Sequence, residues 1–313
     1  MKISAAIQTL LVLGASITVP ISLVQAAPQG EYSLEKAFAS SFSSHRYNAK
    51  RLCGTHISAE RKASVERKFA AQRIAAPETA KAVAPVIDVY FNVIAANKTI
   101  AGGWIPAHQI KSQIAVLNRD FKSTGVQYRL AKVTRYISKR WFNGVAPEGA
   151  MQTEMKQKLR KGGPETLNVY TVGFHNTQAE GLLGHATFPT DYKSLPKDDG
   201  VVIQYGTLPG GNLAPFNKGK TLTHEVGHWV GLYHTFEGGS CSSSGDEVSD
   251  TPAQLKPTSG CPIANPDTCP GKAGLDPIHN FMDYSDDVCL THFSAGQGTR
   301  LRAQLRTYRE IDV

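Results

Sequence analysis

After its first 26 residues, the sequence has no long hydrophobic run. A transmembrane helix needs about 20 consecutive, mostly apolar residues, and no later stretch of the 313-residue chain approaches that length. Hydrophobic residues make up 41% of the chain and charged residues 19%, which is typical of a globular protein with a sizeable core rather than of a disordered one. We therefore expect no stable association with a membrane.

Cysteines are few, and none of them forms the Cys-x-x-Cys pattern typical of a zinc ribbon. Four of the five lie near the C-terminal end, at Cys241, Cys261, Cys269 and Cys289, whereas Cys53 stands alone. Four clustered cysteines can pair in three ways, and disulfides fit an exported protein in an oxidising compartment. The fifth cysteine is then left without a partner.

The sequence also lacks a recognisable nucleic-acid-reading motif, although its net charge is +8. Residues 1–81 contain 11 Lys and Arg against 5 Asp and Glu, whereas the rest of the chain contains 23 against 21. Because the excess charge is confined to one N-terminal part, it is weak evidence for a nucleic-acid partner, and we expect none. We interpret the basic stretch as a solvated, helical segment that can be removed.

The first 26 residues have the layout of a secretory signal peptide. One early lysine precedes a long apolar run, which ends in small residues at Ala26. The alternative is a membrane anchor, but Ser16, Thr18 and Pro20 interrupt the run. We therefore predict a protein secreted to the extracellular space.

From residue 86 onward, predicted strands alternate with predicted helices. Runs of β-branched and aromatic residues indicate the strands, while Pro106 and Gly125 suit the first turn and the end of a helix. This order predicts an α/β (α+β) protein with a mixed, twisted sheet of mostly parallel strands. The predicted strands cover residues 86–95, 126–137, 166–173 and 201–206, and the predicted helices cover residues 105–125 and 150–161.

The segment EGLLGHATFP, residues 180–189, is interpreted as an edge strand because it is rich in glycine and apolar residues. The free backbone groups of an edge strand can pair with an extended peptide. An extended polypeptide is therefore the expected partner of a site beside this segment.

The stretch HEVGHWVGLYH, residues 224–234, contains three of the ten histidines in the chain. On a helix, His224 and His228 lie one turn apart on the same face and can bind one Zn²⁺ ion together. Gly231 can adopt a positive φ angle, and a turn there brings His234 back as the third ligand. Three nitrogen ligands leave one position for water, as in catalytic rather than structural zinc sites.

Glu225 follows the first of these histidines and is the candidate general base that activates water. Two alternatives remain. In one, the chain is a secreted non-catalytic binding protein with structural zinc, which the intact Glu225 and the lack of a fourth ligand argue against. In the other, it is a zinc hydrolase acting on a non-peptide bond, which the edge strand argues against.

HEVGHWVGLYH resembles the extended zinc-binding motif of metzincin metallopeptidases, and HNFMDY, residues 279–284, resembles their methionine turn. The combination is similar to the small secreted form of the pappalysin family. The resemblance implies a metzincin-like zincin fold with an active-site helix, a disulfide-stapled C-terminal subdomain, and zinc-dependent endopeptidase activity. It also implies that Met282 has a structural role and that Tyr284 stabilises the oxyanion formed in the reaction. The alternative for Tyr284 is a tyrosine that is simply packed in the core.

The same resemblance suggests the disulfide pairs Cys241–Cys269 and Cys261–Cys289. It also suggests Ca²⁺ at Asp246 and Thr251, although composition alone says only that this loop is acidic. Asp287 would line the pocket for the residue after the scissile bond and favour Arg or Lys there. The alternative for Asp287 is a solvated surface carboxylate.

Cys53 is the candidate inhibitory switch, because a thiolate is a good zinc ligand and would displace water from the open position. The alternative is a free or adventitiously paired cysteine. With the switch, residues 27–80 form a propeptide and residues 81–313 the metallopeptidase catalytic domain. The sequence shows no clear sign of oligomers, and we expect a monomer.

Overall fold

The computed structural model describes residues 50–75, 84–175 and 178–313. All of them belong to one compact unit, which spans residues 48–313. The predicted signal peptide lies outside the described residues. Within the described ranges, no helix combines the length and the apolar composition that crossing a membrane requires.

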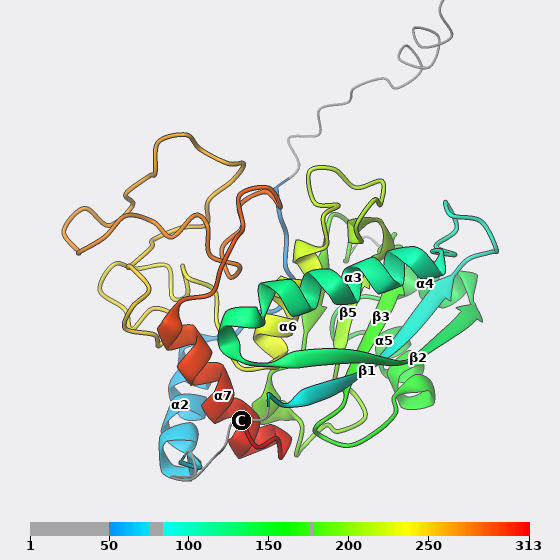
Figure 1. Cartoon of the computed structure of the whole chain (residues 1–313), viewed down its shortest axis with the longest axis horizontal. Helices are drawn as coiled ribbons and strands as arrows, with labels where there is room; N and C mark the ends of the chain where they lie inside the picture. The colour runs from blue at the N-terminus through cyan, green and yellow to red at the C-terminus, as the bar shows by residue number, and fades with distance from the viewer. Residues whose placement is uncertain (1–49, 76–83, 176–177) are drawn as a thin grey trace, which may run out of the picture. The chain divides into compact units, whose positions relative to one another are not determined.

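A five-stranded mixed sheet lies at the centre of this unit, in the order β2-β1-β3-β5-β4 (Figure 1). The first four strands in this order run parallel, whereas β4 runs antiparallel to β5 at the edge. The predicted mixed sheet is therefore confirmed, and the predicted edge strand is three residues long. The strands are β1 (Val86–Ala95), β2 (Gln127–Ile137), β3 (Leu167–Val172), β4 (Gly184–Ala186) and β5 (Val201–Gln204).

The position of each strand in the sheet follows from its sequence. Every residue of β3 is buried, because a central strand of a parallel sheet is covered on both faces and needs a continuous apolar run. β2, at the opposite edge from β4, is partly exposed along most of its length and carries several polar residues. β4, at the other edge, contacts α6 (Lys220–Trp229), which carries His224 and His228 of the histidine motif.

Helices connect the strands where the sequence predicts them. α3 begins after Pro106, buries Ile110, Ile114 and Leu117 against the core, and is followed by a turn through Gly125 at φ 77°. The sequence pattern does not predict α4 or α7. The sequence of α7 is rich in arginine and contains two glycines in its first turns, which obscures the helical pattern. The helices are α2 (Ala59–Gln72), α3 (Ala107–Asp120), α4 (Lys139–Gly144), α5 (Ala150–Leu159), α6 (Lys220–Trp229) and α7 (Ala295–Arg309).

A buried ion cluster attaches α7 to the end of α6. The Asp199 carboxylate accepts hydrogen bonds from Arg309 Nη1 at 2.8 Å and from Trp229 Nε1 at 3.2 Å. The Arg309 guanidinium also lies 3.9 Å from the centre of the Trp229 ring. Burying these charges would be costly if they were unpaired, so the cluster fixes where the C-terminal helix lies.

Between α6 and α7 the chain forms long loops without a named helix or strand, visible beside α7 in Figure 1. Two disulfides cross them, Cys241–Cys269 and Cys261–Cys289, each joining residues 28 positions apart. These are the pairs that the family resemblance implies. Because each bond closes a long loop, it restricts the unfolded chain and stabilises the fold.

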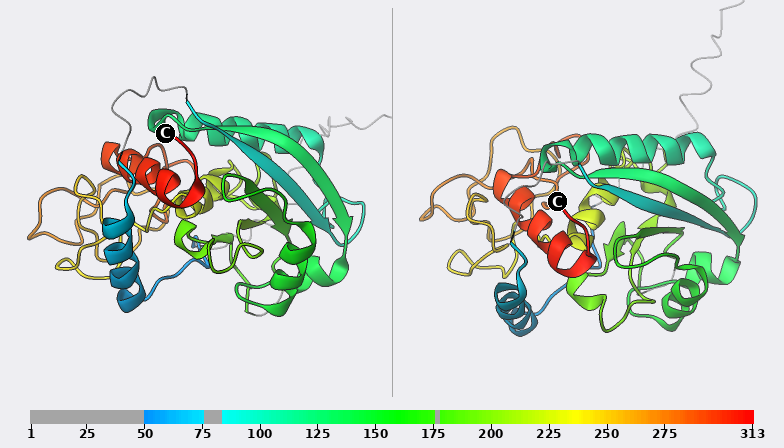
Figure 2. Two further views of the ribbon diagram at one scale, coloured as in Figure 1. Left: turned by 90° about the horizontal axis from the view of Figure 1, so that it is seen from below. Right: turned by 60° about the horizontal axis from the view of Figure 1, so that its bottom comes forward.

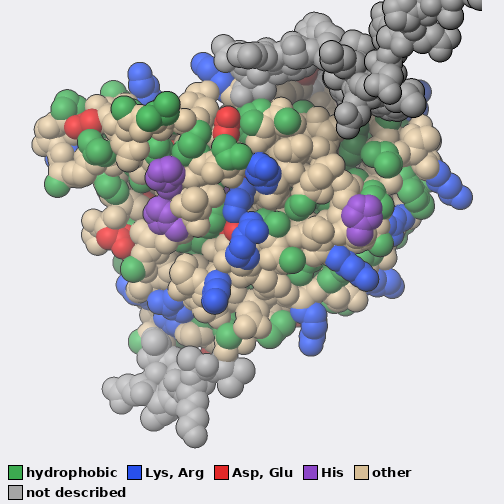
Figure 3. Space-filling model, turned by 45° about the horizontal axis from the view of Figure 1, so that its top comes forward, with side chains coloured by type: hydrophobic (Ala, Val, Ile, Leu, Met, Phe, Trp, Pro, Cys, Tyr) green, Lys and Arg blue, Asp and Glu red, His purple; other side chains and the backbone are tan. Residues whose placement is uncertain are grey.

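The N-terminal helix α2 lies beside α7 (Figure 2). The interpretation of this basic stretch as a helix is confirmed, but it is more than a solvated segment. Phe69 is buried against Tyr308 of α7, and Lys62 is buried beside the loop of Glu247. Elsewhere the basic charge is dispersed. Figure 3 shows Lys and Arg side chains spread over one face of the molecule among uncharged ones.

Candidate active site

α6 and the turn after it place three imidazoles together. All ten residues of α6 are buried, including His224 and His228. The helix ends at Trp229, and Gly231 then reverses the chain at φ 96°, a conformation that favours glycine. Leu232 N–H donates to Gly227 O at 2.9 Å and closes the turn, which directs His234 back toward the helix.

Backbone and carboxylate oxygens orient the three rings from behind. His224 Nδ1 lies 2.7 Å from Phe281 O, and His228 Nδ1 lies 2.8 Å from Leu232 O. His234 Nδ1 lies 3.4 Å from Glu237 Oε2. Such contacts fix ring orientation in metal sites, and here they point each Nε2 toward a shared space.

The donor set fits a metal ion. His228 Nε2 and His234 Nε2 are 3.1 Å apart, and His224 Nε2 is buried without a hydrogen-bond partner in the described part of the chain. Burial, then the neighbouring imidazoles, lowers the pKa of His224 and His228, so both rings are neutral and able to ligate. The candidate ligand atoms of Cys53 and the three histidines all lie within 4.8 Å of one another.

Glu225 faces the same space and is 1% exposed. Its Oε2 accepts hydrogen bonds from Cys53 Sγ at 3.4 Å and from Thr55 Oγ1 at 3.3 Å. Burial raises the pKa of Glu225 to about 8, partly offset by these hydrogen bonds and by Arg51. A carboxyl group with a pKa in this range can both take up and release a proton near neutral pH.

Tyr284 and Met282 complete the surroundings of the histidines. Tyr284 Oη lies 3.3 Å from His234 Nε2, and burial, then the nearby Cys53 and Glu225, raises the pKa of Tyr284 so that it remains an O–H donor. Met282 is fully buried against α6, where a Cβ on Gly227 would lie only 2.3 Å from its sulfur. The methionine turn therefore packs directly against α6, the helix that carries His224 and His228.

Cys53 is free, is buried, and lies in an extended segment that pairs with β4. Gly54 N–H donates to Gly184 O at 2.8 Å, and Leu183 N–H donates to Leu52 O at 2.9 Å. Burial, followed by the charge of Glu225, raises the pKa of the thiol well above its usual value. Cys53 Sγ lies 3.6 Å from His228 Nε2, so the segment occupies the open side of the histidine cluster.

Asp287 is not a solvated carboxylate, because it is 1% exposed. It forms an ion pair with Arg51, whose Nη2 lies 2.5 Å from Asp287 Oδ1. The Arg51 guanidinium also donates to Ser285 O and lies 5.0 Å from the centre of the Phe216 ring. Asp287 Oδ2 accepts from the backbone N–H of Lys218 at 2.7 Å, which fixes the carboxylate beside the Arg51 guanidinium.

A second set of contacts attaches α2 to the body of the unit. Arg300 donates from Nη2 to Glu66 Oε1 at 2.6 Å and from Nη1 to Glu66 Oε2 at 3.0 Å, and Tyr233 donates to the same carboxylate at 2.8 Å. Arg300 Nε also donates to Gly231 O at 3.0 Å. One arginine therefore connects α2 with the turn that positions His234.

Asp246 and Thr251 lie together, apart from the histidines, in the loop that α2 also contacts. Thr251 donates to Asp246 Oδ1 at 2.7 Å, while Asp246 Oδ2 is buried with no hydrogen-bond partner among the described residues. Burial raises the pKa of Asp246 to about 7. The ammonium group of Lys62 reaches this loop, with Nζ 3.0 Å from Glu247 Oε1.

Sequence reasoning missed two residues of the site, Arg51 and Thr55. A signal for both was present in RLCGTH, since residues two apart in an extended segment point to the same side of the chain. Arg51, Cys53 and Thr55 therefore face the cleft together. The partner of each side chain could not be found without the fold.

The fold and the site together define a metallopeptidase. A family model described as Pregnancy-associated plasma protein-A, Peptidase_M43, matches residues 165–306. An extracellular metalloprotease of Verticillium alfalfae is 46% identical over 264 residues, which cover 82% of this chain and 89% of that protein. The chain belongs to the Peptidase_M43 family, the pappalysins.

Other relatives and solved structures agree with this assignment. Extracellular metalloprotease 1 of Coccidioides posadasii is 43% identical over 77% of this chain and 86% of its own. A promirolysin mutant of Tannerella forsythia superposes with a TM-score of 0.68 at 26% identity, covering 82% of this chain and 95% of that one. Mature mirolysin of the same organism, in complex with a cleaved peptide, superposes with a TM-score of 0.60 at 28% identity. The superposition covers 72% of this chain and 95% of that one.

We predict that Gly231→Ala disrupts the histidine cluster. A Cβ there would lie 2.5 Å from Gln304 Cγ and would also strain the positive φ, lowering the free energy of unfolding by about 3 kcal/mol. Zinc affinity should fall at least tenfold, measured by competition with a chelator. Gly125→Ala is the matched control, since its φ is 77° but nothing lies within 4 Å of the added Cβ. Equal losses in the two variants would contradict the prediction.

A second prediction concerns pH and Glu66. Burial alone would raise its pKa, but the hydrogen bonds and charge of Arg300 outweigh burial and lower it. A lowered pKa stabilises the fold above the ordinary value of 4.5, and this stabilisation is lost as the pH falls through the lowered pKa.

Glu66→Gln should therefore reduce the free energy of unfolding by about 2 kcal/mol at pH 7. The difference from the unaltered chain should shrink below pH ~4, measured by denaturant titration. Glu154→Gln, which breaks the exposed ion pair with Arg140, is the control and should cost at most about 0.5 kcal/mol. A Glu66 effect independent of pH would refute the ion-pair explanation.

Proposed function

We propose that this metallopeptidase is a secreted zinc endopeptidase held inactive by its own N-terminal segment. The observation that carries the proposal is the position of Cys53, whose thiol contacts both His228 and the candidate general base Glu225. If zinc is bound by the histidines, a thiol at this point would compete with water for the ion. Residues 27–80 would then be the propeptide and residues 81–313 the catalytic domain.

His224, His228 and His234 would hold the zinc ion through their Nε2 atoms. When bound, zinc supplies Lewis-acid chemistry, which makes water more acidic and polarises a carbonyl group. Glu225 would take the proton from water and return it to the leaving amine. Once Cys53 and Thr55 have left, its Oε2 loses both hydrogen-bond donors and faces water. The Tyr284 O–H would donate a hydrogen bond to the developing oxyanion.

The Asp287 pocket would select Arg or Lys at the residue after the scissile bond. Arg51 supports this assignment, because an arginine of the chain itself already fills the pocket and pairs with Asp287 at 2.5 Å. A charge-assisted hydrogen bond to a buried carboxylate is stronger than a neutral one. The pocket would therefore discriminate by charge as well as by shape.

Calcium would bind in the loop of Asp246 and Thr251. The buried, unpaired Asp246 Oδ2 supports a cation there, since carboxylate and hydroxyl oxygens are ligands that Ca²⁺ accepts. Lys62 places a positive charge on the same loop from α2. We propose calcium as a structural ion for this part of the C-terminal loops.

The partners would be extended polypeptides that pair with the free edge of β4. The names of the relatives support an extracellular location, and we propose that the protein acts there as a monomer without membrane or nucleic-acid partners. The alternative, a non-catalytic binding protein with structural zinc, does not explain why the carboxyl group of Glu225 is buried beside the histidines.

Glu225→Gln tests the general base. The substitution keeps the shape and burial of the side chain but removes its ability to accept a proton, so kcat/KM for a peptide should fall at least ~100-fold. The variant is activated with a trace of the unaltered enzyme, and its zinc content should remain unchanged. Glu154→Gln, an exposed carboxylate on α5, should retain full activity. Undiminished hydrolysis by the zinc-loaded Glu225 variant would end the proposal.

Asp287→Asn tests the pocket. For peptides with Arg after the scissile bond, kcat/KM should fall by ~10-fold or more, because a charged hydrogen bond becomes neutral. For matched peptides with norleucine at that position it should hardly change. Asp286→Asn, the half-exposed neighbour, is the control variant. Parallel loss on both peptides would show that Asp287 supports the fold rather than selecting the substrate.

A further inference from the structure

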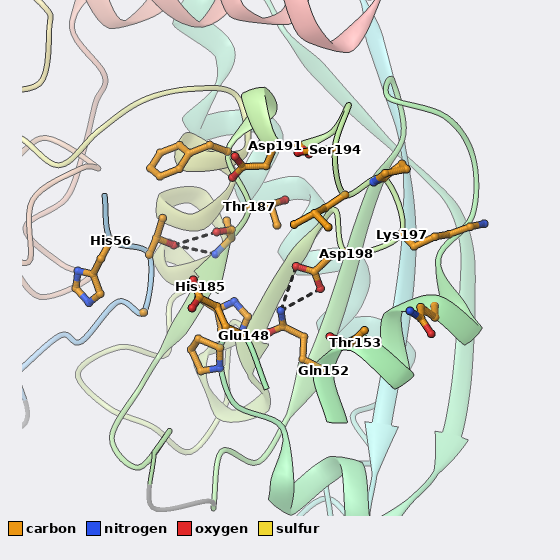
Figure 4. Close-up of a pocket in the computed structure, with 18 of the residues that line it drawn as sticks. His56, Glu148, Gln152, Thr153, His185, Thr187, Asp191, Ser194, Lys197 and Asp198 are labelled. Carbon is orange, nitrogen blue, oxygen red and sulfur yellow. Dashed lines mark hydrogen bonds between the residues drawn. The ribbon is translucent and has the colours of Figure 1, made fainter. Parts of the chain in front are cut away.

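A cavity of about 850 Å³ opens beside Gly54 and Thr55, and the hydroxyl group of Thr55 contacts Glu225. β4, the loop after it and α5 form its walls, and no step of the proposed reaction uses it. In Figure 4, Asp191 and Ser194 lie at one end of the cavity and Glu148, Gln152 and Thr153 at the other. Its size and its contact with the site make it a candidate for binding part of a substrate.

The direction of the bound N-terminal segment indicates which part of a substrate the cavity would bind. The segment runs from Arg51 in the Asp287 pocket, past Cys53 at the histidines, to Thr55 at the cavity, and it pairs with Gly184 in the parallel sense. This step rests on the proposed function. If Asp287 receives the residue after the scissile bond, residues before that bond must lie on the cavity side.

The charge of the cavity indicates the side chain that it would accept. Among the lining residues, Gly54, Thr55, His56 and Arg61 belong to the N-terminal segment and leave with it. The lining that remains after the segment has left carries three carboxylates, Glu148, Asp191 and Asp198, and one lysine, Lys197. A carboxylate-rich, partly enclosed wall favours a basic side chain.

Arg61 shows that a guanidinium fits this place. Its Nη2 lies 2.5 Å from Asp191 Oδ1, and in the described part of the chain it is the ion-pair partner of that carboxylate. The Asp198 carboxylate is held differently, by Gln152 Nε2 at 3.1 Å and by the buried Lys156 at 3.6 Å. Asp191 is therefore the carboxylate that loses its partner when the segment is removed.

The inner wall offers a further polar contact. His185 of β4 is 4% exposed, and its Nε2 is buried with no hydrogen-bond partner among the described residues. From these observations we infer that the cavity binds a basic side chain of the substrate upstream of the scissile bond, and that Asp191 is its specificity-determining residue.

The test uses the zinc-loaded enzyme after removal of the N-terminal segment, and peptides that all carry Arg after the scissile bond. At each of the second to fifth positions upstream of that bond, Arg is compared with norleucine and Glu. At one position, Arg should raise kcat/KM about fivefold over norleucine, the size expected of a half-exposed ion pair. The advantage should decrease with added salt.

Asp191→Asn should abolish this advantage and leave the norleucine peptides unchanged, whereas Asp191→Lys should reverse it in favour of Glu. Glu154→Gln is the matched control, since Glu154 lies on α5 with an exposed ion pair but does not line the cavity. Cleavage that is indifferent to the upstream residue, or an equal loss on every peptide in both Asp191 variants, would overturn the inference while leaving the proposed function intact. No cleavage of any peptide would overturn both.

Discussion

The reversal of the chain at Gly231 is the constraint on which the site depends. A helix can bring His224 and His228 together by itself, but His234 would face away if the helix continued. The turn is held from several sides, by Gln304 against the glycine, by Arg300 on its carbonyl oxygen, and by the return hydrogen bond of Leu232. α7 therefore supports the turn that positions His234, although none of its residues is near the histidines in sequence.

The same helix links α2 to the turn that positions His234. Arg300 contacts both the Gly231 carbonyl and the Glu66 carboxylate, so docking of α2 satisfies a buried guanidinium that also supports the turn. α7 is anchored at its other end by the Asp199 cluster with Arg309. Charges at both ends of α7 are thus paired inside the protein, where an unpaired charge would be strongly unfavourable.

The cleft presents buried acidic and metal-ligating groups that need partners, and the N-terminal segment supplies one for each. Arg51 neutralises Asp287, Cys53 contacts the imidazoles, and Thr55 donates to Glu225. Because an unsatisfied buried polar group costs free energy, the segment is held by the same groups that would bind substrate. In the proposed function, latency and substrate selection would therefore depend on one set of side chains.

The sequence by itself determined the features that depend on short-range spacing. These include the alternation of strands and helices from residue 86, the helical pair His224 and His228, the turn at Gly231, and the family to which the motif belongs. Each rests on the period of a helix or strand or on the conformation of a single residue, so neighbouring positions suffice to define it.

Only the tertiary structure decided which distant side chains meet. Arg51 lies 236 positions from Asp287, Glu66 lies 234 from Arg300, and Arg61 lies 130 from Asp191. No local pattern encodes these pairs, because ionic contacts between distant segments follow from where the sheet and helices bring them. The docking of α2, the pairing of Asp287 and the cavity beside Gly54 and Thr55 could for this reason be found only in the folded chain.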